Sequence, residues 1–287
     1  MGTVAPTGLL VEGAWRPVLL KRLASAIVLL PVFLLIVLKA PRWTYNVVVV
    51  LASAAALWEL TRMLEQAGRP VYRRLGVVAG VAVTVAFAAS GMLDPLVLPV
   101  VALTVGAAVI LAAPLWRPGP LSVEPVANTL LAVIYVGWLL GYGILLHHTS
   151  PRGDALVLFV VGVTWVGESA AYLVGSTLGR RPLAPTISPR KTLEGAAAQV
   201  VASLATGAVL GAWLLPSCGG AVALLAGGLL GIVGQIGDLA ESVLKRSVGT
   251  KDTGGLIPGH GGVLDRIDSL LFNLPAFYYV SVLTGCR

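Results

Sequence analysis

The chain has 287 residues, of which 57% are hydrophobic and only 11% are charged, and its mean hydropathy is +0.90. A soluble domain carries roughly 25% Asp, Glu, Lys and Arg, so this composition cannot supply a polar shell for a globule of this size. With two cysteines and no charge-rich or Gly-x-y tract, the chain is also not a disulfide-rich secreted, disordered or collagen-like protein. The composition predicts a polytopic membrane protein.

Continuous apolar stretches cover most of the chain. A helix needs about 20 mainly apolar residues to cross roughly 30 Å of hydrocarbon. About nine windows meet this need: 22–38, 43–61, 75–93, 96–113, 127–146, 155–176, 193–215, 220–241 and 264–285. None shows the alternation of a barrel strand, and lipid favours backbones that form their hydrogen bonds internally. We therefore expect an all-α transmembrane bundle of about nine spans.

The basic residues fall mostly on one side of these nine spans. Only four of the twenty Lys and Arg residues lie on the other side: Lys39, Arg42, Arg152 and Arg287. Because basic loops stay in the cytoplasm, we expect a cytoplasmic N-terminus, an external C-terminus and residence in the inner (plasma) membrane. The net charge of +7 then lies mostly against the anionic inner leaflet, and it implies no nucleic-acid partner.

Two further features concern processing and oxidation. The first apolar window is followed by Lys39, Pro41 and Arg42 without a small-x-small cleavage site, so we expect a retained span. Cys218 and Cys286 both map to the non-cytoplasmic side, where a disulfide is conceivable. We favour two unrelated structural cysteines.

Acidic residues are concentrated in the second half of the chain. Seven of the thirteen lie between positions 168 and 268: Glu168, Glu194, Asp238, Glu241, Asp252, Asp265 and Asp268. This asymmetry predicts two parts. We expect residues 1–150 to be a scaffold of about five spans, and residues 151–287 to be a catalytic half of about four spans whose site faces the cytoplasm.

The densest polar run is residues 237–268. Asp238, Glu241 and Lys245 share one face near the cytoplasmic end of the eighth span, where the structural alternative is a Glu241–Lys245 pair beside a solvated Asp238. Asp265 and Asp268 follow on the first turn of the ninth span, after a glycine-rich turn that can bring the two helix ends together. Helix capping is their structural alternative.

Oxygen-only carboxylate clusters suit hard cations such as Mg²⁺, which also take ligands from substrate phosphates. Zinc is improbable because His260 is the only nearby nitrogen ligand, and a histidine between glycines is usually a solvated loop residue. Glycines at a helix start admit a phosphate, and four cations lie nearby: Lys245, Arg246, Lys251 and Arg266. Together these features indicate phosphoryl or nucleotidyl transfer.

Two more polar elements precede this run. Pro189 sets an extended approach to the seventh span, Ser188 or Thr192 could cap it, and Arg190 and Lys191 flank its free N–H groups. An ordinary cytoplasmic basic cluster is the alternative. Glu168 lies inside the sixth span, so it should face the bundle interior and be paired, protonated or metal-bound, with an interhelical hydrogen bond as the alternative.

Residues 242–268 resemble the signature of the phosphatidate cytidylyltransferases, or CDP-diacylglycerol synthases. The matching positions are Ser242, Leu244, Lys245, Arg246, Lys251, Asp252, Gly254, Ile257, Pro258, His260, Gly261, Gly262, Val263, Asp265, Arg266, Ile267 and Asp268. Residues 188–192 and 165–172 also resemble family motifs, in the same order. Glu168 departs from the pattern, because family members usually carry Asp there.

The resemblance implies transfer of a cytidylyl group from CTP to phosphatidate, giving CDP-diacylglycerol and pyrophosphate for phospholipid biosynthesis at the cytoplasmic membrane surface. It implies Mg²⁺, with a second cation as an option. The metal would be held by Asp238, Asp265 and Asp268, with Glu168 as a further candidate, and Lys245 joins the three aspartates as a catalytic residue. The implied substrate-binding residues are Ser188, Arg190, Lys191, Thr192, Arg246, Lys251, Asp252, His260, Gly261, Gly262 and Arg266.

Other function classes remain open. An ion or solute transporter would place charges near the bilayer midplane in two repeats, whereas the acids here gather at helix ends in one half of the chain. A CTP-dependent polyprenol kinase would also use CTP and act in a membrane, but its acceptor would be a neutral alcohol. A non-catalytic scaffold would leave the convergence of carboxylates and cations unexplained. The sequence leaves the oligomeric state open, with a homodimer among the candidates.

Overall fold

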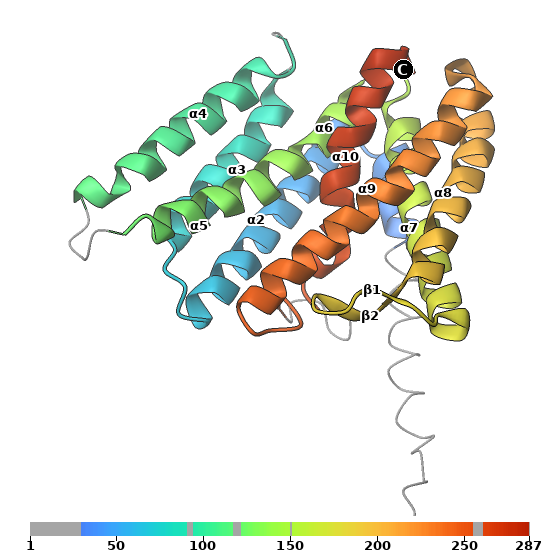
Figure 1. Ribbon diagram of the computed structural model, residues 1–287. Helices are drawn as coiled ribbons and strands as arrows, with labels where there is room; N and C mark the ends of the chain where they lie inside the picture. Colours follow the sequence, from blue (N-terminus) through green and yellow to red (C-terminus); the bar gives the residue numbers. More distant parts are fainter. Residues whose placement is uncertain (1–29, 91–93, 117–121, 150, 255–260, 287) are drawn as a thin grey trace, which may run out of the picture.

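The computed structural model describes residues 30–90, 94–116, 122–149, 151–254 and 261–286. Helices running side by side make up almost all of this part of the chain (Figure 1). Seven of its helical stretches are long and apolar enough to cross a membrane: Arg42–Gln66, Val97–Trp116, Glu124–His148, Gly153–Leu178, Leu193–Leu214, Gly220–Ser247 and Leu264–Thr284. The expectation of a polytopic helical membrane protein is confirmed.

Two further predicted windows are also helical. Helix α3 (Arg73–Ala89) has 17 residues. Residues 30–38 are helical as well, and the earlier part of the window 22–38 lies outside the described residues. The remaining helices of the N-terminal part are α2 (Arg42–Gln66) and α4 (Val97–Ala112), which is followed by the short 3₁₀ helix η1 (Ala113–Trp116).

Among the seven long apolar stretches of the described residues, Glu124–His148 is buried to the largest share, and it is irregular in the middle. Helix α5 (Glu124–Ala132) continues through a π-helical segment, η2 (Val133–Trp138), into α6 (Leu139–His148). Glycines allow this span to approach α3 closely, since a Cβ on Gly137 would lie 2.6 Å from the carbonyl oxygen of Gly80. Helix α6 also packs against α10 from the other end of the chain, so one core joins both halves.

Four long helices form the C-terminal half: α7 (Gly153–Leu178), α8 (Leu193–Leu214), α9 (Gly220–Ser247) and α10 (Leu264–Thr284). Small residues bring α8 and α9 into backbone contact, because a Cβ on Gly207 would lie 2.8 Å from the Cα of Gly227. Apolar side chains gain little by association within lipid, so close backbone packing of this kind is how membrane helices usually associate.

A short β-hairpin between α7 and α8 departs from the expected all-α fold. Strand β1 (Pro182–Ala184) pairs antiparallel with β2 (Ser188–Thr192). Prolines at 182, 185 and 189 disfavour a helix here. The extended approach predicted from Pro189 is confirmed. Of the two proposed caps, Thr192 is the one used, since its Oγ1 accepts a hydrogen bond from the Gly195 N–H at 3.1 Å.

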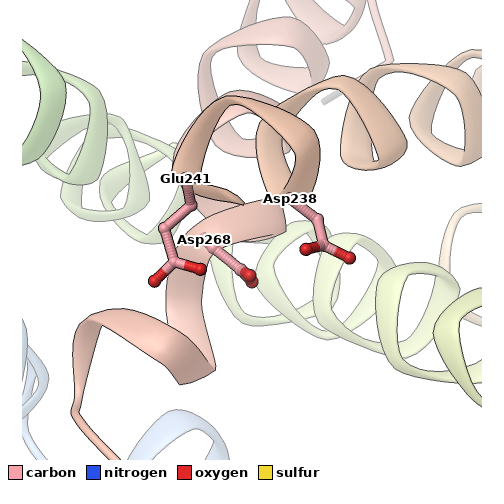
Figure 2. Close-up of side chains that lie close together, drawn as sticks. All are labelled: Asp238, Glu241 and Asp268. Carbon is pink, nitrogen blue, oxygen red and sulfur yellow. The ribbon is translucent and has the colours of Figure 1, made fainter. Parts of the chain in front are cut away.

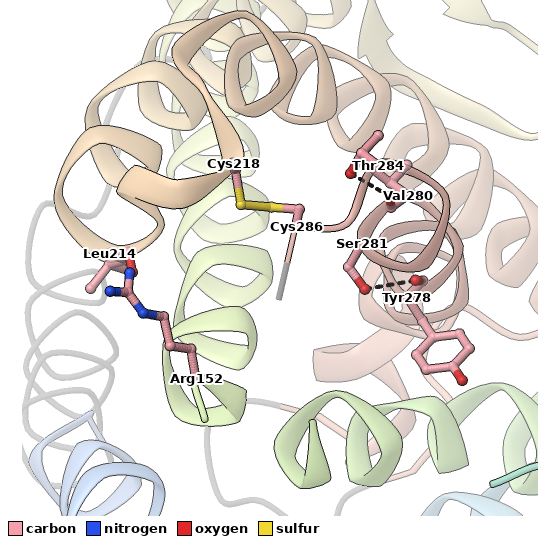
Figure 3. Close-up of a disulfide and its surroundings, with 8 residues drawn as sticks. All are labelled: Arg152, Leu214, Cys218, Tyr278, Val280, Ser281, Thr284 and Cys286. Atoms are coloured by element: carbon pink, nitrogen blue, oxygen red, sulfur yellow. Dashed lines mark hydrogen bonds between the residues drawn. A yellow bond between two sulfur atoms is a disulfide. The ribbon is translucent and has the colours of Figure 1, made fainter. Parts of the chain in front are cut away.

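The cysteine prediction was wrong. Cys218 and Cys286 form a disulfide, with their Cα atoms 4.6 Å apart (Figure 3). Cys218 ends the 3₁₀ helix η3 (Pro216–Cys218) between α8 and α9, and Cys286 follows α10. Sequence spacing could not reveal the pair, because 68 positions separate the cysteines and only helix packing brings these two helix ends together. The C-terminus and the β-hairpin lie at opposite ends of the bundle (Figure 1).

Candidate active site

Three carboxylates meet where the C-terminal end of α9 passes the first turns of α10. One oxygen from each of Asp238, Glu241 and Asp268 lies within 4.8 Å of the other two (Figure 2). Gly237 makes this contact possible, because a Cβ there would lie 2.9 Å from the carbonyl oxygen of Asp268. We call these three residues the carboxylate cluster.

The cluster has the charge and chemistry of a cation site. Two like charges about 4 Å apart repel by roughly 4 kcal/mol at an effective dielectric of 20. Glu241 is fully buried, so water cannot relieve this repulsion there. Oxygen-only ligands suit Mg²⁺, and the residues present therefore fit the metal that the resemblance implies. Glu241 was named from the sequence only as a partner of Lys245.

Lys245 connects the cluster to Asp265. Its Nζ donates to Glu241 Oε2 and also to Asp265 Oδ1, the latter at 2.9 Å. The other oxygen of Asp265 accepts the backbone N–H groups of Gly262 at 2.8 Å and Thr253 at 3.2 Å. The intrahelical Glu241–Lys245 pair is thus present, but Lys245 also bridges to α10. A metal-ligand role for Asp265 stays a prediction, and its oxygens already have three donors.

A glycine with a left-handed backbone fits this turn. Gly261 has a φ of 81°, a conformation that side chains rarely allow. A Cβ at Gly261 would also lie 2.9 Å from Asp265 Oδ2. The glycine therefore allows the chain to fold back tightly over the first turn of α10.

The β-hairpin brings cations to the other side of the cluster. Lys191 Nζ forms an ion pair with Asp238 Oδ2 at 2.7 Å, so Asp238 is not simply a solvated group. Arg246, at the end of α9, holds the hairpin in place by donating from Nε to the Ile187 carbonyl oxygen at 3.2 Å. It also donates to the Thr250 carbonyl oxygen at 3.0 Å.

A cavity of about 540 Å³ adjoins the cluster between α7, α8, α9 and the hairpin. Asp238 belongs to both the cavity and the cluster. Its lining combines the charged side chains Arg190, Lys191 and Glu168 with larger, mainly apolar ones such as Tyr172 and Leu183. A lining with both kinds of group suits an amphipathic ligand. Asp268 and Asp238 are charged neighbours of Glu168, so this residue faces the bundle interior as expected.

Other predicted site residues lie around this centre. Thr192 lines the cavity while capping α8, and Ser188 begins β2. Lys251 and Asp252 are exposed in the loop after α9, and Arg266 is exposed on the first turn of α10. Gly262 is buried. His260 lies outside the described residues.

Sequence reasoning missed Glu59, which reaches the site from α2. This carboxylate is 3% exposed, and its Oε2 accepts the backbone N–H of Leu264, the first residue of α10, at 3.0 Å. A Cβ on Gly254 or Gly262 would lie within 2.7 Å of a Glu59 oxygen, so both glycines make room for it. Glu59 lies inside an apolar window. A carboxylate within a membrane span is expected to face the bundle interior, and this argument, which identified Glu168, could have identified Glu59 as well.

Several known proteins are similar in sequence to this chain. The model of the cytidylyltransferase family matches residues 20–284. Over 152 residues the chain is 45% identical to the uncharacterized protein YnbB of Escherichia coli, covering 53% of this chain and 49% of that protein. It is 40% identical over 153 residues to the phosphatidate cytidylyltransferase of Bacillus subtilis, covering 53% and 57% of the two chains.

The phosphatidate cytidylyltransferase of Synechocystis is 38% identical over 197 residues, which cover 59% of this chain and 66% of the relative. The matches thus span about half to two thirds of the length of these curated relatives. The family model, by contrast, covers nearly all of the present sequence. The chain belongs to the cytidylyltransferase family.

Proposed function

We propose that this protein is a membrane-embedded nucleotidyltransferase that converts CTP and phosphatidate to CDP-diacylglycerol and pyrophosphate. The observation that carries the proposal is the carboxylate cluster, flanked by Lys191 and Lys245 and adjoining a cavity lined by both charged and apolar groups. Two of the relatives above bear the name of this activity.

The cluster residues Asp238, Glu241 and Asp268 would hold Mg²⁺. When bound, the metal would neutralise phosphate charge and stabilise the departing pyrophosphate. We keep the sequence-based prediction that Asp265 and a second cation also take part. Glu168 stays a candidate ligand, because it lines the cavity near Asp238.

The reaction needs no nucleophile from the protein. A phosphate oxygen of phosphatidate forms a bond to the α-phosphorus of CTP, and the bond from that phosphorus to the bridging oxygen breaks. The electron pair leaves with pyrophosphate. The chain must therefore bind and align two polyanions. Arg190 and Lys191 at the cavity, and Arg246, Lys251 and Arg266 around the helix ends, supply cations for this task.

The apolar groups of the cavity lining suit the acyl chains of phosphatidate. Tyr172 and Leu183 are among them, and Tyr172 is 75% exposed. A diacyl lipid could keep its tails in the bilayer while its phosphate reaches Lys191. Such an arrangement explains why an enzyme that uses a nucleotide is built as a membrane bundle.

We further propose nine spans, a cytoplasmic site and an external C-terminus, in the inner (plasma) membrane. Helix α3 and the helix at residues 30–38 would add two spans to the seven that satisfy the length and composition criteria. The Cys218–Cys286 disulfide supports this orientation, because disulfides persist on the oxidising side of a membrane. The site and the C-terminus are at opposite ends of the bundle (Figure 1). A homodimer stays a prediction.

The proposal is tested with purified full-length protein, phosphatidate, Mg²⁺ and CTP labelled in the cytosine ring. We expect a lipid-soluble cytidine product that Asp268→Asn does not form. A parallel reaction with CTP labelled at the γ-phosphate and a polyprenol tests the kinase alternative. Label transferred to the polyprenol, without a cytidine lipid in the first reaction, would overturn the proposal.

A further inference from the structure

One buried hydroxyl near the carboxylate cluster makes no hydrogen bond to any residue that the structure describes. Tyr135 is 6% exposed, and its Oη makes no hydrogen bond within the described part of the chain. The other buried tyrosines of the same core are satisfied. Tyr45 donates to the Gly143 carbonyl oxygen at 3.3 Å, and Tyr142 shares a hydrogen bond of 2.7 Å with Tyr279. A buried donor without an acceptor is costly and needs an explanation.

The surroundings of Tyr135 place it beside the cluster. Its ring packs edge-on against Phe272, with ring centroids 6.3 Å apart. Phe272 lies one helical turn after Asp268 on α10. The charged groups that act on the Tyr135 hydroxyl are Glu241, Asp268 and Asp238, the three members of the cluster. Glu241 Oε1 is also buried and accepts no hydrogen bond from the described residues, so a donor and an acceptor are both unsatisfied here.

The backbone that carries Tyr135 is unusual as well. The residue belongs to the π-helical segment η2, within the central span of the N-terminal half. Single π-helical turns are rare inside α-helices and often occur at functional sites. An added residue in a turn rotates the side chains that follow it, so η2 alters which side chains of this span face α10.

We propose that the Tyr135 hydroxyl donates a hydrogen bond to an oxygen atom in the coordination sphere of the cation at the carboxylate cluster. The inference rests on the proposed function for the identity of the cation. It adds to the site a residue from the N-terminal half, which the sequence had assigned to the scaffold. Tyr135 acts through ligand oxygens and does not replace a carboxylate.

The test measures metal binding directly, with Mn²⁺ as a spectroscopic probe for the Mg²⁺ site. Free Mn²⁺ is followed by electron paramagnetic resonance during titration of the purified full chain, with and without CTP. Groups that orient metal ligands typically contribute about tenfold or more to affinity. We expect Tyr135→Phe to weaken Mn²⁺ binding about tenfold and Asp268→Asn to weaken it further. Because the hydroxyl makes no hydrogen bond to the described part of the chain, Tyr135→Phe should not lower the melting temperature.

Tyr142→Phe is the matched control. It also removes one buried tyrosine hydroxyl from the same span, but that hydroxyl bonds to Tyr279. We expect it to lower the melting temperature and to leave Mn²⁺ affinity unchanged. A loss of affinity in Tyr135→Phe with Mn²⁺ alone supports a protein or water oxygen as the acceptor, and a loss only with CTP supports a phosphoryl oxygen.

Three results would overturn the inference. They are unchanged Mn²⁺ affinity of Tyr135→Phe in both titrations, a melting temperature lowered as far as in Tyr142→Phe, and Mn²⁺ binding that Asp268→Asn does not weaken. These outcomes are separate from the proposed function. If wild-type protein binds Mn²⁺ but forms no cytidine lipid, the reaction is wrong while the role of Tyr135 is still decided by the titration.

Discussion

Replacing Asp265 by Asn keeps the shape of the side chain and removes the charge that three donors share. Hydrogen bonds to charged groups contribute about 1.5–3 kcal/mol and neutral ones about 0.5–1.5, so each backbone bond from Gly262 and Thr253 should lose about 1 kcal/mol. Breaking a buried ion pair costs about 3–5 kcal/mol. The pair with Lys245 is well buried, with side-chain exposures of 13% and 8%. Because Lys245 keeps Glu241 as a partner, we expect a total loss of about 3–5 kcal/mol.

A loss of this size corresponds to a fall in melting temperature on the order of 10 °C for a large domain. Turnover should fall by much more than tenfold, which is a rise of at least about 1.4 kcal/mol in the activation free energy. The assays are thermal unfolding in detergent and formation of the cytidine lipid, with Asp268→Asn beside it. More than a tenth of wild-type activity together with an unchanged melting temperature would refute the reasoning.

The Mn²⁺ titration separates two roles of Asp265. If Asp265 ligates the cation, as its place in the family motif predicts, Asp265→Asn should weaken Mn²⁺ binding as strongly as Asp268→Asn. If its oxygens serve Lys245 and the turn at Gly262 instead, affinity should fall less while stability falls more. The contacts of the structure favour the second result.

The other predictions concern three further sites. Glu59→Gln should stay close to wild type, because its amide oxygen can still accept the Leu264 N–H, whereas Glu59→Ala should lower both turnover and melting temperature; equal behaviour of the two variants would count against that contact. Glu168→Asp should retain activity, since it restores the residue that family members usually carry, and collapse of turnover would show that the surrounding helices require Glu. Reduction of the Cys218–Cys286 disulfide should lower thermal stability, by up to ~4 kcal/mol on a chain-entropy estimate for a loop of 68 residues, without removing activity at low temperature. If reduction abolished turnover without lowering thermal stability, the placement of the disulfide away from the site would be contradicted.

Much of the architecture could be predicted from composition alone. Lipid cannot satisfy backbone hydrogen bonds, so long apolar windows have to be helical, and nearly every window in the described part of the chain is. Contacts between neighbours in sequence could also be predicted. Thr192 caps α8 because a hydroxyl three residues before a free N–H can do so in any context. The short i, i+3 spacing of Asp238 and Glu241 also put them on one helix face.

Contacts between distant segments could not be read from the sequence. Glu59 and Leu264 are 205 positions apart, Cys218 and Cys286 are 68 apart, and Tyr135 reaches α10 from the middle of the chain. The sequence placed Asp265 and Asp268 on one turn. The packing of α9 against α10 puts Asp268 into the carboxylate cluster, whereas Asp265 forms an ion pair with Lys245. Apolar windows specify helices but not their rotation or their neighbours. In lipid those are decided by close backbone contacts at small residues such as Gly237, which exist only once the bundle has assembled.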